Sequence, residues 1–358
     1  MAPSLPLDTP TSRHPAFRPL RRTLACLAVA AASLTGLGLP AAQAQTPIKF
    51  SLNFKPDGSN AAWFLAAERG YFKEAGLDVA LDTSAGTGDV IQRLASNTYD
   101  LGCADIGTLI EFAGRNPQQA PVTVMVLYAR SPLAIISFKK AGINRPSDLI
   151  GKRMGAPAND GAFRMWPTFA KAAGIDASKV QNQNVDIRVR ETMLVRGEYE
   201  GAYGYDSSMW FNLKPMGVKL EDLSFLRYAD YGLDFYGNSV MASRKFMAEH
   251  PKEVEAFTRI TARAWREAMA DPKAAVAALY KREPLINVEV EIEKLQWLTK
   301  NQLTTPQTRA EGMGAVDIGR LDKQIAAITE AFQLPSLPAT NAIYDAKFLP
   351  PRAERQLP

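Results

Sequence analysis

The chain has 358 residues, 42 of them basic and 37 acidic, with two histidines and two cysteines. This length is too great for one small core and is typical of two lobes of ordinary domain size. His14 and Cys26 fall in an N-terminal leader, so His250 and Cys103 remain. One histidine and one cysteine cannot form a metal site rich in His or Cys. A histidine-dependent hydrolase would have only His250 as its base.

The first 44 residues have the pattern of an export signal. Four arginines within residues 1–22 precede apolar or small residues over 24–39, and Ala42-Gln43-Ala44 matches a small-x-small cleavage site. We therefore predict a signal peptide over residues 1–44, cleaved near Ala44, and a periplasmic location. Arg21-Arg22 also fits a loose twin-arginine signal, so the export route stays open.

The composition behind the leader argues against two kinds of partner. The leader's apolar run is too short to span a membrane, and no later run is longer, so no stable membrane insertion is expected. Without the leader the charges nearly balance and no run of Lys or Arg remains. A nucleic-acid partner is therefore not expected.

The chain behind the leader begins with a β-α-β pattern. A strand over residues 48–54 precedes a helix that starts at Ala61, and a second strand follows over 78–81. The polar loop over residues 55–60 joins the first strand to the helix. In open α/β sheets such a loop lies at the carboxyl edge of the strands, where ligands bind.

Alternating strands and helices continue as far as residue 228. The unbroken apolar run over 122–128 predicts a strand buried in a parallel sheet. The predicted strands lie at 100–103, 122–128, 134–138, 153–156, 185–189, 199–205 and 225–228, and the predicted helices at 89–96, 108–114, 161–173, 191–196 and 207–216.

Helices dominate the remainder of the chain. Apolar residues from Val254 to Ala268 form a helical stripe that ends at Asp271-Pro272. Further helices are predicted over 273–281 and 288–301, although Val288, Val290 and Ile292 alternate as in a strand. Whether the proline-rich tail, residues 334–358, packs or hangs free is left open.

Three segments carry a family resemblance: AAWFLAAERGYFKEAGLDVAL over residues 61–81, PSDLIGKR over 146–153 and DFYGNSVM over 234–241. The chain resembles periplasmic solute-binding proteins of ABC importers, in the branch that handles nitrate, taurine, alkanesulfonates and thiamine-pyrimidine precursors. The resemblance implies an α/β, two-lobed type II periplasmic-binding-protein fold. Each lobe is expected to be a mixed, mostly parallel sheet flanked by helices, with two hinge crossings. We expect lobe 1 over 45–135 and 236–358, and lobe 2 over 136–235.

The function implied is capture of a solute between the lobes and delivery to an ABC-transporter permease with its ATPase. The protein is expected to be a monomer and not an enzyme, with no catalytic residues, no cofactor and no metal. Aromatic residues near the predicted loops favour a small aromatic or heteroaromatic organic compound, with or without an anionic group.

The candidate ligand-binding residues lie where predicted strands lead into helices. We expect backbone N–H groups of residues 159–163 to hold a polar or anionic end, with charge from Arg164 or Lys55, while Trp63 covers a flat face. Trp63 and Trp166 could instead be core, and Asp105 and Asp160 could be helix caps. The candidates are Phe54, Lys55, Asp57, Asn60, Trp63, Thr87, Asp105, Asn159, Asp160, Gly161, Ala162, Phe163, Arg164, Trp166, Tyr205, Asp206, Tyr236 and Asn238.

Two alternative functions stay open. The same branch includes iron-dependent synthases that make the thiamine pyrimidine from histidine and pyridoxal phosphate. The resemblance implies that such enzymes carry a cysteine-rich iron motif and an active-site histidine, and this chain has neither. The other alternative is the ligand-binding input of a sensor system, which the sequence does not separate from import.

Overall fold

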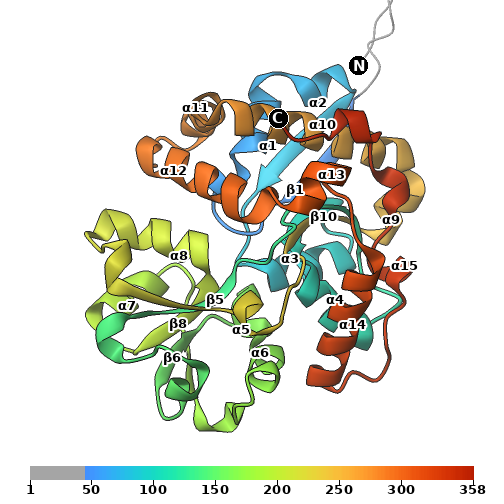
Figure 1. Ribbon diagram of the computed structural model, residues 1–358. Coiled ribbons are helices and arrows are strands. Elements are labelled where there is room, and N and C mark those ends of the chain that lie inside the picture. Colours follow the sequence, from blue (N-terminus) through green and yellow to red (C-terminus); the bar gives the residue numbers. More distant parts are fainter. Residues whose placement is uncertain (1–44) are drawn as a thin grey trace, which may run out of the picture. The chain divides into compact units, whose positions relative to one another are not determined.

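The computed structural model describes residues 45–358, so the predicted signal peptide, residues 1–44, lies outside the described part. Strands in this part form two five-stranded sheets (Figure 1). The first sheet has the order β2-β1-β3-β10-β4 and the second has the order β7-β6-β8-β5-β9. The strands are β1 (Thr46–Ser51), β2 (Leu77–Asp82), β3 (Leu101–Asp105), β4 (Val122–Val126), β5 (Leu133–Phe138), β6 (Arg153–Ala156), β7 (Gln181–Asn184), β8 (Gly201–Tyr205), β9 (Leu223–Arg227) and β10 (Asn238–Ala242).

Both sheets are mixed, and in each of them four strands share one direction. In the first sheet β1 pairs in parallel with β2 and β3, whereas β10 runs antiparallel to β3 and β4. In the second sheet β6 pairs in parallel with β7 and β8, whereas β5 runs antiparallel to β8 and β9. The predicted fold class, a two-lobed α/β structure with mixed, mostly parallel sheets, is confirmed.

Helices cover the faces of both sheets (Figure 1). We call the first sheet with α1–α4 and α9–α15 lobe 1, and the second sheet with α5–α8 lobe 2; the residue limits expected for the lobes stay a prediction. The helices of lobe 1 are α1 (Ala61–Glu68), α2 (Tyr71–Glu74), α3 (Thr87–Ala95), α4 (Ile106–Arg115), α9 (Arg244–Glu249), α10 (Pro251–Ala270), α11 (Pro272–Arg282), α12 (Val288–Leu298), α13 (Pro306–Glu311), α14 (Ile318–Phe332) and α15 (Thr340–Ile343). Those of lobe 2 are α5 (Gly161–Arg164), α6 (Trp166–Ala172), α7 (Arg190–Arg196) and α8 (Asp206–Leu213).

The chain passes between the two sheets twice, and the two crossings lie side by side. One crossing joins β4 to β5 and the other joins β9 to β10. The amide of Gly237 donates to the carbonyl of Tyr128 over 2.9 Å, and the amide of Ser131 donates to the carbonyl of Phe235 over 3.0 Å. Such a paired connection can act as a hinge, because a few backbone torsions there reorient the whole of each lobe.

Three predicted elements are corrected by the structure. Within its sheet β4 does not pair in parallel, since it is an edge strand that pairs antiparallel with β10; it also makes an isolated parallel bridge from Thr123 to Tyr344. Its apolar run reflects burial on both faces, which does not depend on strand direction. Residues 185–189 are not a strand; the strand is the fully exposed, polar β7 just before them. The helix predicted over 161–173 is two helices, because Pro167 begins a new helical turn.

Two open points of the sequence analysis are decided. The segment from Val288 is a helix, α12, and not a strand. The C-terminal tail packs on lobe 1: Phe348 is buried, and its carbonyl accepts a hydrogen bond from the hydroxyl of Thr258 on α10. No helix in residues 45–358 is long and apolar enough to cross a bilayer.

Candidate functional site

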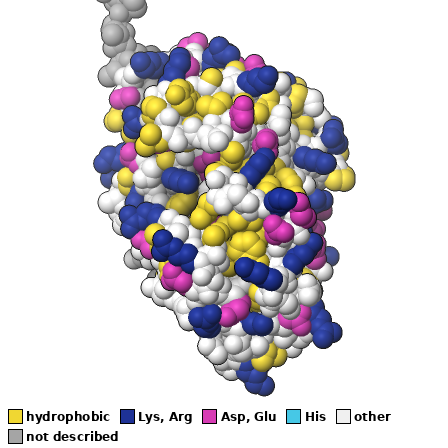
Figure 2. Space-filling model, turned by 90° about the vertical axis from the view of Figure 1, so that its left-hand side faces the viewer, with side chains coloured by type: hydrophobic (Ala, Val, Ile, Leu, Met, Phe, Trp, Pro, Cys, Tyr) yellow, Lys and Arg dark blue, Asp and Glu magenta, His cyan; other side chains and the backbone are white. Residues whose placement is uncertain are grey.

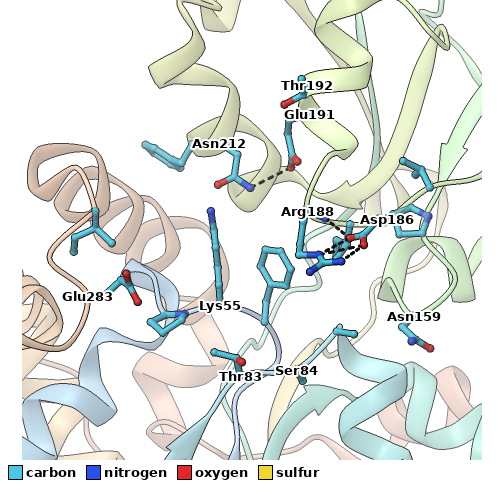
Figure 3. Close-up of a pocket in the computed structure, with 18 of the residues that line it drawn as sticks. Lys55, Thr83, Ser84, Asn159, Asp186, Arg188, Glu191, Thr192, Asn212 and Glu283 are labelled. Carbon is cyan, nitrogen blue, oxygen red and sulfur yellow. Dashed lines mark hydrogen bonds and ion pairs between the residues drawn. The ribbon is translucent and has the colours of Figure 1, made fainter.

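Two cavities lie between the lobes at the carboxyl ends of the strands. The larger has a volume of about 1080 Å³ (Figure 3), and the smaller, about 30 Å³. Phe54 of lobe 1 and Ile187 of lobe 2 line both cavities, so the two are neighbouring parts of one cleft. The smaller cavity is also lined by Asn53, Gly86, Thr87, Asp160, Gly161, Arg190, Tyr205 and Ser208.

The larger cavity takes its polar lining from loops of both lobes. Lys55 follows β1 in lobe 1 and extends toward Asn212 and Glu191 of lobe 2 (Figure 3). Among the described residues Lys55 has no carboxylate within ion-pair distance in the structure. Further polar groups on this lining are Thr83, Ser84, Asn159, Asn184, Asp186, Arg188, Thr192, Glu283 and Asn287.

The lobes touch beside the smaller cavity, where α3 of lobe 1 begins. The amide of Gly88 donates to the carbonyl of Asn159 over 3.3 Å. Gly86 has a φ of +118°, and a Cβ there would lie 2.6 Å from the same Asn159 carbonyl oxygen. Only glycine permits both this backbone conformation and this approach between the lobes.

Asp160 occupies the amides that the sequence analysis assigned to a ligand. Its Oδ1 accepts hydrogen bonds from the amides of Ala162 (2.8 Å) and Phe163 (3.3 Å). The helix that they begin, α5, has only four residues. The amides of Ala162 and Phe163 are therefore not free to bind an anion, because the chain's own carboxylate caps them. Binding of a solute at the rest of residues 159–163 stays a prediction.

Arg190 is a buried guanidinium that the sequence analysis missed. It lies 3.0 Å from Asp160 and 2.7 Å from Glu191, and it donates to the carbonyl of Tyr203. Burial raises the pKa of Asp160, an effect that the charge of Arg190 opposes. A signal for Arg190 was present, since the predicted strand over 185–189 and the predicted helix over 191–196 place it at a strand-to-helix edge, where the other candidates were chosen.

Arg164 is engaged across the lobes and does not point to a solute. It forms an ion pair with Glu111 of α4 in lobe 1, and Glu111 also pairs with Arg115 over 3.0 Å. The expectation that Arg164 supplies charge to a ligand is thus not supported; its position is that of a contact between the lobes.

Several candidate residues are part of the packed interior. Trp63 is 1% exposed: its ring lies 4.7 Å from that of Phe50, and its Nε1 donates to Thr261. Trp166 is buried against Phe169 and Tyr203. The core alternative left open for both tryptophans is the observed one. Phe163, half-buried against Tyr203, and Ala162, fully buried, also lie outside both cavities.

Asp105 lies under the cleft as a helix cap. Its Oδ1 accepts from the amide of Thr108 at the start of α4, and its own amide donates to Thr87 Oγ1 over 2.6 Å. Burial, with a smaller effect from the charge of Asp160, raises the pKa of Asp105 to about 7. This carboxyl therefore changes charge near neutral pH, although it lines neither cavity.

The remaining candidates hold the structure around the cleft. The hydroxyl of Tyr205, on the smaller cavity, donates to Asn238 Oδ1 over 2.8 Å and so joins the two lobes beside the hinge. Asp206 pairs with Arg227, and the hydroxyl of Tyr236 donates to Gln307. Asp57 and Asn60 are buried and cap the short 3₁₀ turn before α1.

Seven of the predicted residues line a cavity, and their contact with a solute stays a prediction. They share positions at strand-to-helix edges: Phe54, Lys55, Thr87, Asn159, Asp160, Gly161 and Tyr205. Within residues 45–358 no three His, Cys, Asp or Glu side chains are grouped as metal ligands.

Comparisons with known proteins agree with this architecture. A family model described as NMT1/THI5 like matches residues 59–275. The chain is 28% identical over 264 residues to the formylaminopyrimidine-binding protein of Halalkalibacterium halodurans, covering 72% of this chain and 78% of that protein. It is 27% identical to the riboflavin-binding protein RibY of Chloroflexus aurantiacus, covering 66% and 67%.

Two further similarities bear on function and fold. The chain is 25% identical to the 4-amino-5-hydroxymethyl-2-methylpyrimidine phosphate synthase of Schizosaccharomyces pombe, covering 63% of this chain and 66% of that protein. In structure it is similar to the alkanesulfonate-binding protein SsuA of Xanthomonas axonopodis pv. citri bound to MOPS. That similarity has a TM-score of 0.65 and 14% identity, and it covers 85% of this chain and 99% of that one.

Proposed function

The chain belongs to the NMT1/THI5-like family, and from this premise we propose that it is an extracytoplasmic solute-binding protein that delivers a neutral nitrogen heterocycle to an ABC-transporter permease. Binding energy in such a protein comes from contacts with both lobes, so the solute favours the closed form that the permease recognises. The cleft between the lobes supplies polar groups from both sides, as this mechanism requires.

One observation carries the choice of a neutral solute: each arginine that lines the cleft is already paired with a carboxylate of the chain. Arg190 pairs with Asp160 and Glu191. Arg93 pairs with Asp89 and Arg188 with Asp186, each within its own lobe. A guanidinium whose charge is satisfied has little left to offer a sulfonate, phosphate or carboxylate, and the amides of Ala162 and Phe163 in α5 are capped as well.

The remaining polar groups suit hydrogen bonding to a neutral ring. Asparagine and hydroxyl side chains line the larger cavity, and each offers donors and acceptors without net charge. Lys55 is the one cation on the lining of the two cavities that has no carboxylate within ion-pair distance among the described residues, and it extends toward Glu191 (Figure 3). Phe54 and Ile187, from opposite lobes, supply apolar surface for the faces of a planar compound.

The surface around the cleft also carries positive and negative side chains side by side. Figure 2 views the molecule from the side of α8 and α12 and shows Lys and Arg interspersed with Asp and Glu around a central apolar area. A field of one sign, which would steer an ionic solute, is not seen on this face. The relatives named for formylaminopyrimidine and riboflavin support a heterocyclic solute, and the cavity volume admits either size.

The test is a thermal-shift screen of the purified protein against formylaminopyrimidine, riboflavin, MOPS and nitrate. A neutral heterocycle at about one hundred times its Kd should stabilise the protein by ~2.7 kcal/mol, while MOPS and nitrate should leave the melting temperature unchanged. Stabilisation by MOPS alone would replace the heterocycle with a sulfonate as the solute.

A synthase is the second candidate, because a relative carries that name. The cysteine and the histidine of the described residues, Cys103 and His250, line neither cavity. Cys103 is buried in β3, and His250 stacks on Phe246 where α9 ends. We therefore favour a binding protein without turnover; formation of the pyrimidine phosphate from pyridoxal phosphate by the purified, iron-supplemented protein would overturn that choice.

A further inference from the structure

Helix α12 of lobe 1 carries a buried lysine. Lys294 has no measurable exposure, and its Nζ lies 3.0 Å from both Asp57 Oδ2 and Glu291 Oε2. Burial by itself would lower the pKa of Lys294, but the two carboxylates outweigh it and hold the pKa above its ordinary value. The lysine is therefore charged, and its cluster with Asp57 and Glu291 is a fixed feature of the interior.

The same two carboxylates bind the backbone of the loop that enters the cleft. Glu291 Oε2 accepts from the amide of Gly58 over 2.7 Å, and Asp57 Oδ1 accepts from the amide of Ser59 over 2.9 Å. A Cβ on Gly58 would lie 2.3 Å from the carbonyl oxygen of Glu291. The loop and α12 thus approach each other as closely as glycine allows. Residues 53–56, immediately before this anchor, line the two cavities.

Another face of α12 contacts lobe 2. Val290 is buried in an apolar cluster with residues of lobe 2 that include Phe211. The ring of Trp297 meets that of Phe211 edge-on at 6.0 Å, and Glu293 forms an ion pair with Lys214. One helix therefore holds the cleft loop on one side and touches the opposite lobe, at α8, on another.

We propose that Lys294 is a positioning residue that fixes the cleft loop, residues 53–59, to α12, so that the loop and the contact between α12 and α8 form one unit during closure. The lysine acts through its carboxylates and does not touch the solute. The inference rests on the proposed function only in that the loop faces the solute, and it can be tested without any ligand.

The test is amide hydrogen exchange of the ligand-free protein with the substitution Lys294→Met. The amides of Gly58 and Ser59 should exchange at least ~10-fold faster, while amides of β3 and β8 keep their wild-type rates. The matched control is Lys281→Met, which removes an exposed lysine paired with Glu68 on the same lobe and should change neither set. Unchanged exchange in the loop, or equal acceleration throughout the protein, would overturn the proposal.

Two further variants keep the test decisive. If Lys294→Met does not fold, Gly58→Ala separates the loop from α12 while the three charges remain, and the same loop amides should lose protection. For the link to lobe 2, Phe211→Ala removes the partner of Trp297 and should also accelerate exchange at Gly58 and Ser59. If the Phe211→Ala protein keeps full protection there, the loop and the α12–α8 contact are independent and the proposal fails.

Discussion

Trp63 illustrates how the setting of one residue decides its role. Its ring packs between Phe50 and Trp265 in the core of lobe 1, whereas Phe54 lines the cleft. We expect Trp63→Ala to lower the free energy of unfolding by ~3–5 kcal/mol, as for other emptied aromatic sites, with the affinity of the folded fraction nearly unchanged. Urea denaturation and calorimetric titration measure the two quantities.

Phe54→Ala is the matched comparison. It should weaken solute binding by about tenfold, because an aromatic face is lost, and should cost less stability than the change at Trp63. The reverse order, with affinity lost at Trp63 and retained at Phe54, would show that the packing seen around Trp63 opens when solute binds.

Asp105 predicts a pH dependence of stability. Its folded pKa of about 7 lies above the ordinary value of 3.8, so the folded protein binds this proton more tightly than the unfolded chain. The protonated Asp105 carboxyl stabilises the folded state fully below about pH 4, and this stabilisation is lost as the pH rises to about 7. For this pKa shift the stabilisation amounts to roughly 4 kcal/mol. Asp105→Asn retains a cap for α4 and should be more stable than wild type at pH 8. Equal pH profiles for the two proteins would place the Asp105 carboxyl at an ordinary pKa.

At the scale of residues, the sequence predicted where the cleft loops lie but not which side chains point into it. Phe54 and Asp160 follow strands and Tyr205 is the last residue of one, and the β-α pattern therefore located them. Trp63 and Phe54 are both aromatic and nine positions apart, and periodicity alone did not tell core from cleft. Arg190 pairs with Asp160, which lies 30 residues before it in the chain, and a local sequence pattern does not reveal such a contact.

At the scale of elements, the amphipathic helices and three of the four edge strands were predicted, whereas the edge strand β7 was missed. The stripe of α10 and the start of α12 correspond to observed helices. Strand β7 has the sequence QNQN and no apolar face, so it has no alternation to detect. The residues after it alternate as a strand would but form a loop, and residues 184–188 line the larger cavity.

The start of α3 offers a test of closure at the scale of an element. Gly86→Ala should weaken solute binding by about tenfold or more, since the new Cβ would meet the carbonyl of Asn159 and hold the lobes apart. The matched control is Gly76→Ala, which has a φ of +73° and no atom within 4 Å of the added Cβ. Gly76→Ala costs backbone strain of ~1 kcal/mol. Gly86→Ala costs more, about 1–3 kcal/mol, because a φ of +118° with a ψ of 177° is a conformation essentially confined to glycine. Equal affinities in the two variants would show that Gly86 matters only for its backbone conformation.

At the scale of the whole molecule, the two-lobed fold was predictable, and the charge balance of the cleft was not. The chain length implied two lobes and the family resemblance implied a double crossing, both of which are observed. The expectation of an anionic group on the solute rested on the amides of residues 159–163 and on charge from Arg164 or Lys55. Pairing of Arg164 with Glu111 and capping of the Ala162 and Phe163 amides by Asp160 weaken that expectation, whereas Lys55 still lines the cleft. The contacts of Arg164 and Asp160 exist only in three dimensions.

The central claim, capture of a neutral heterocycle in a charge-balanced cleft, is tested most directly by calorimetric titration at two salt concentrations. The wild-type protein is titrated with the best heterocycle of the thermal-shift screen at about 20 mM and about 500 mM NaCl. We predict Kd values that agree within about twofold, because binding without a net ionic contact is not screened by salt. A Kd that rises tenfold or more at the higher salt, or tighter binding of MOPS than of any heterocycle, would contradict the claim.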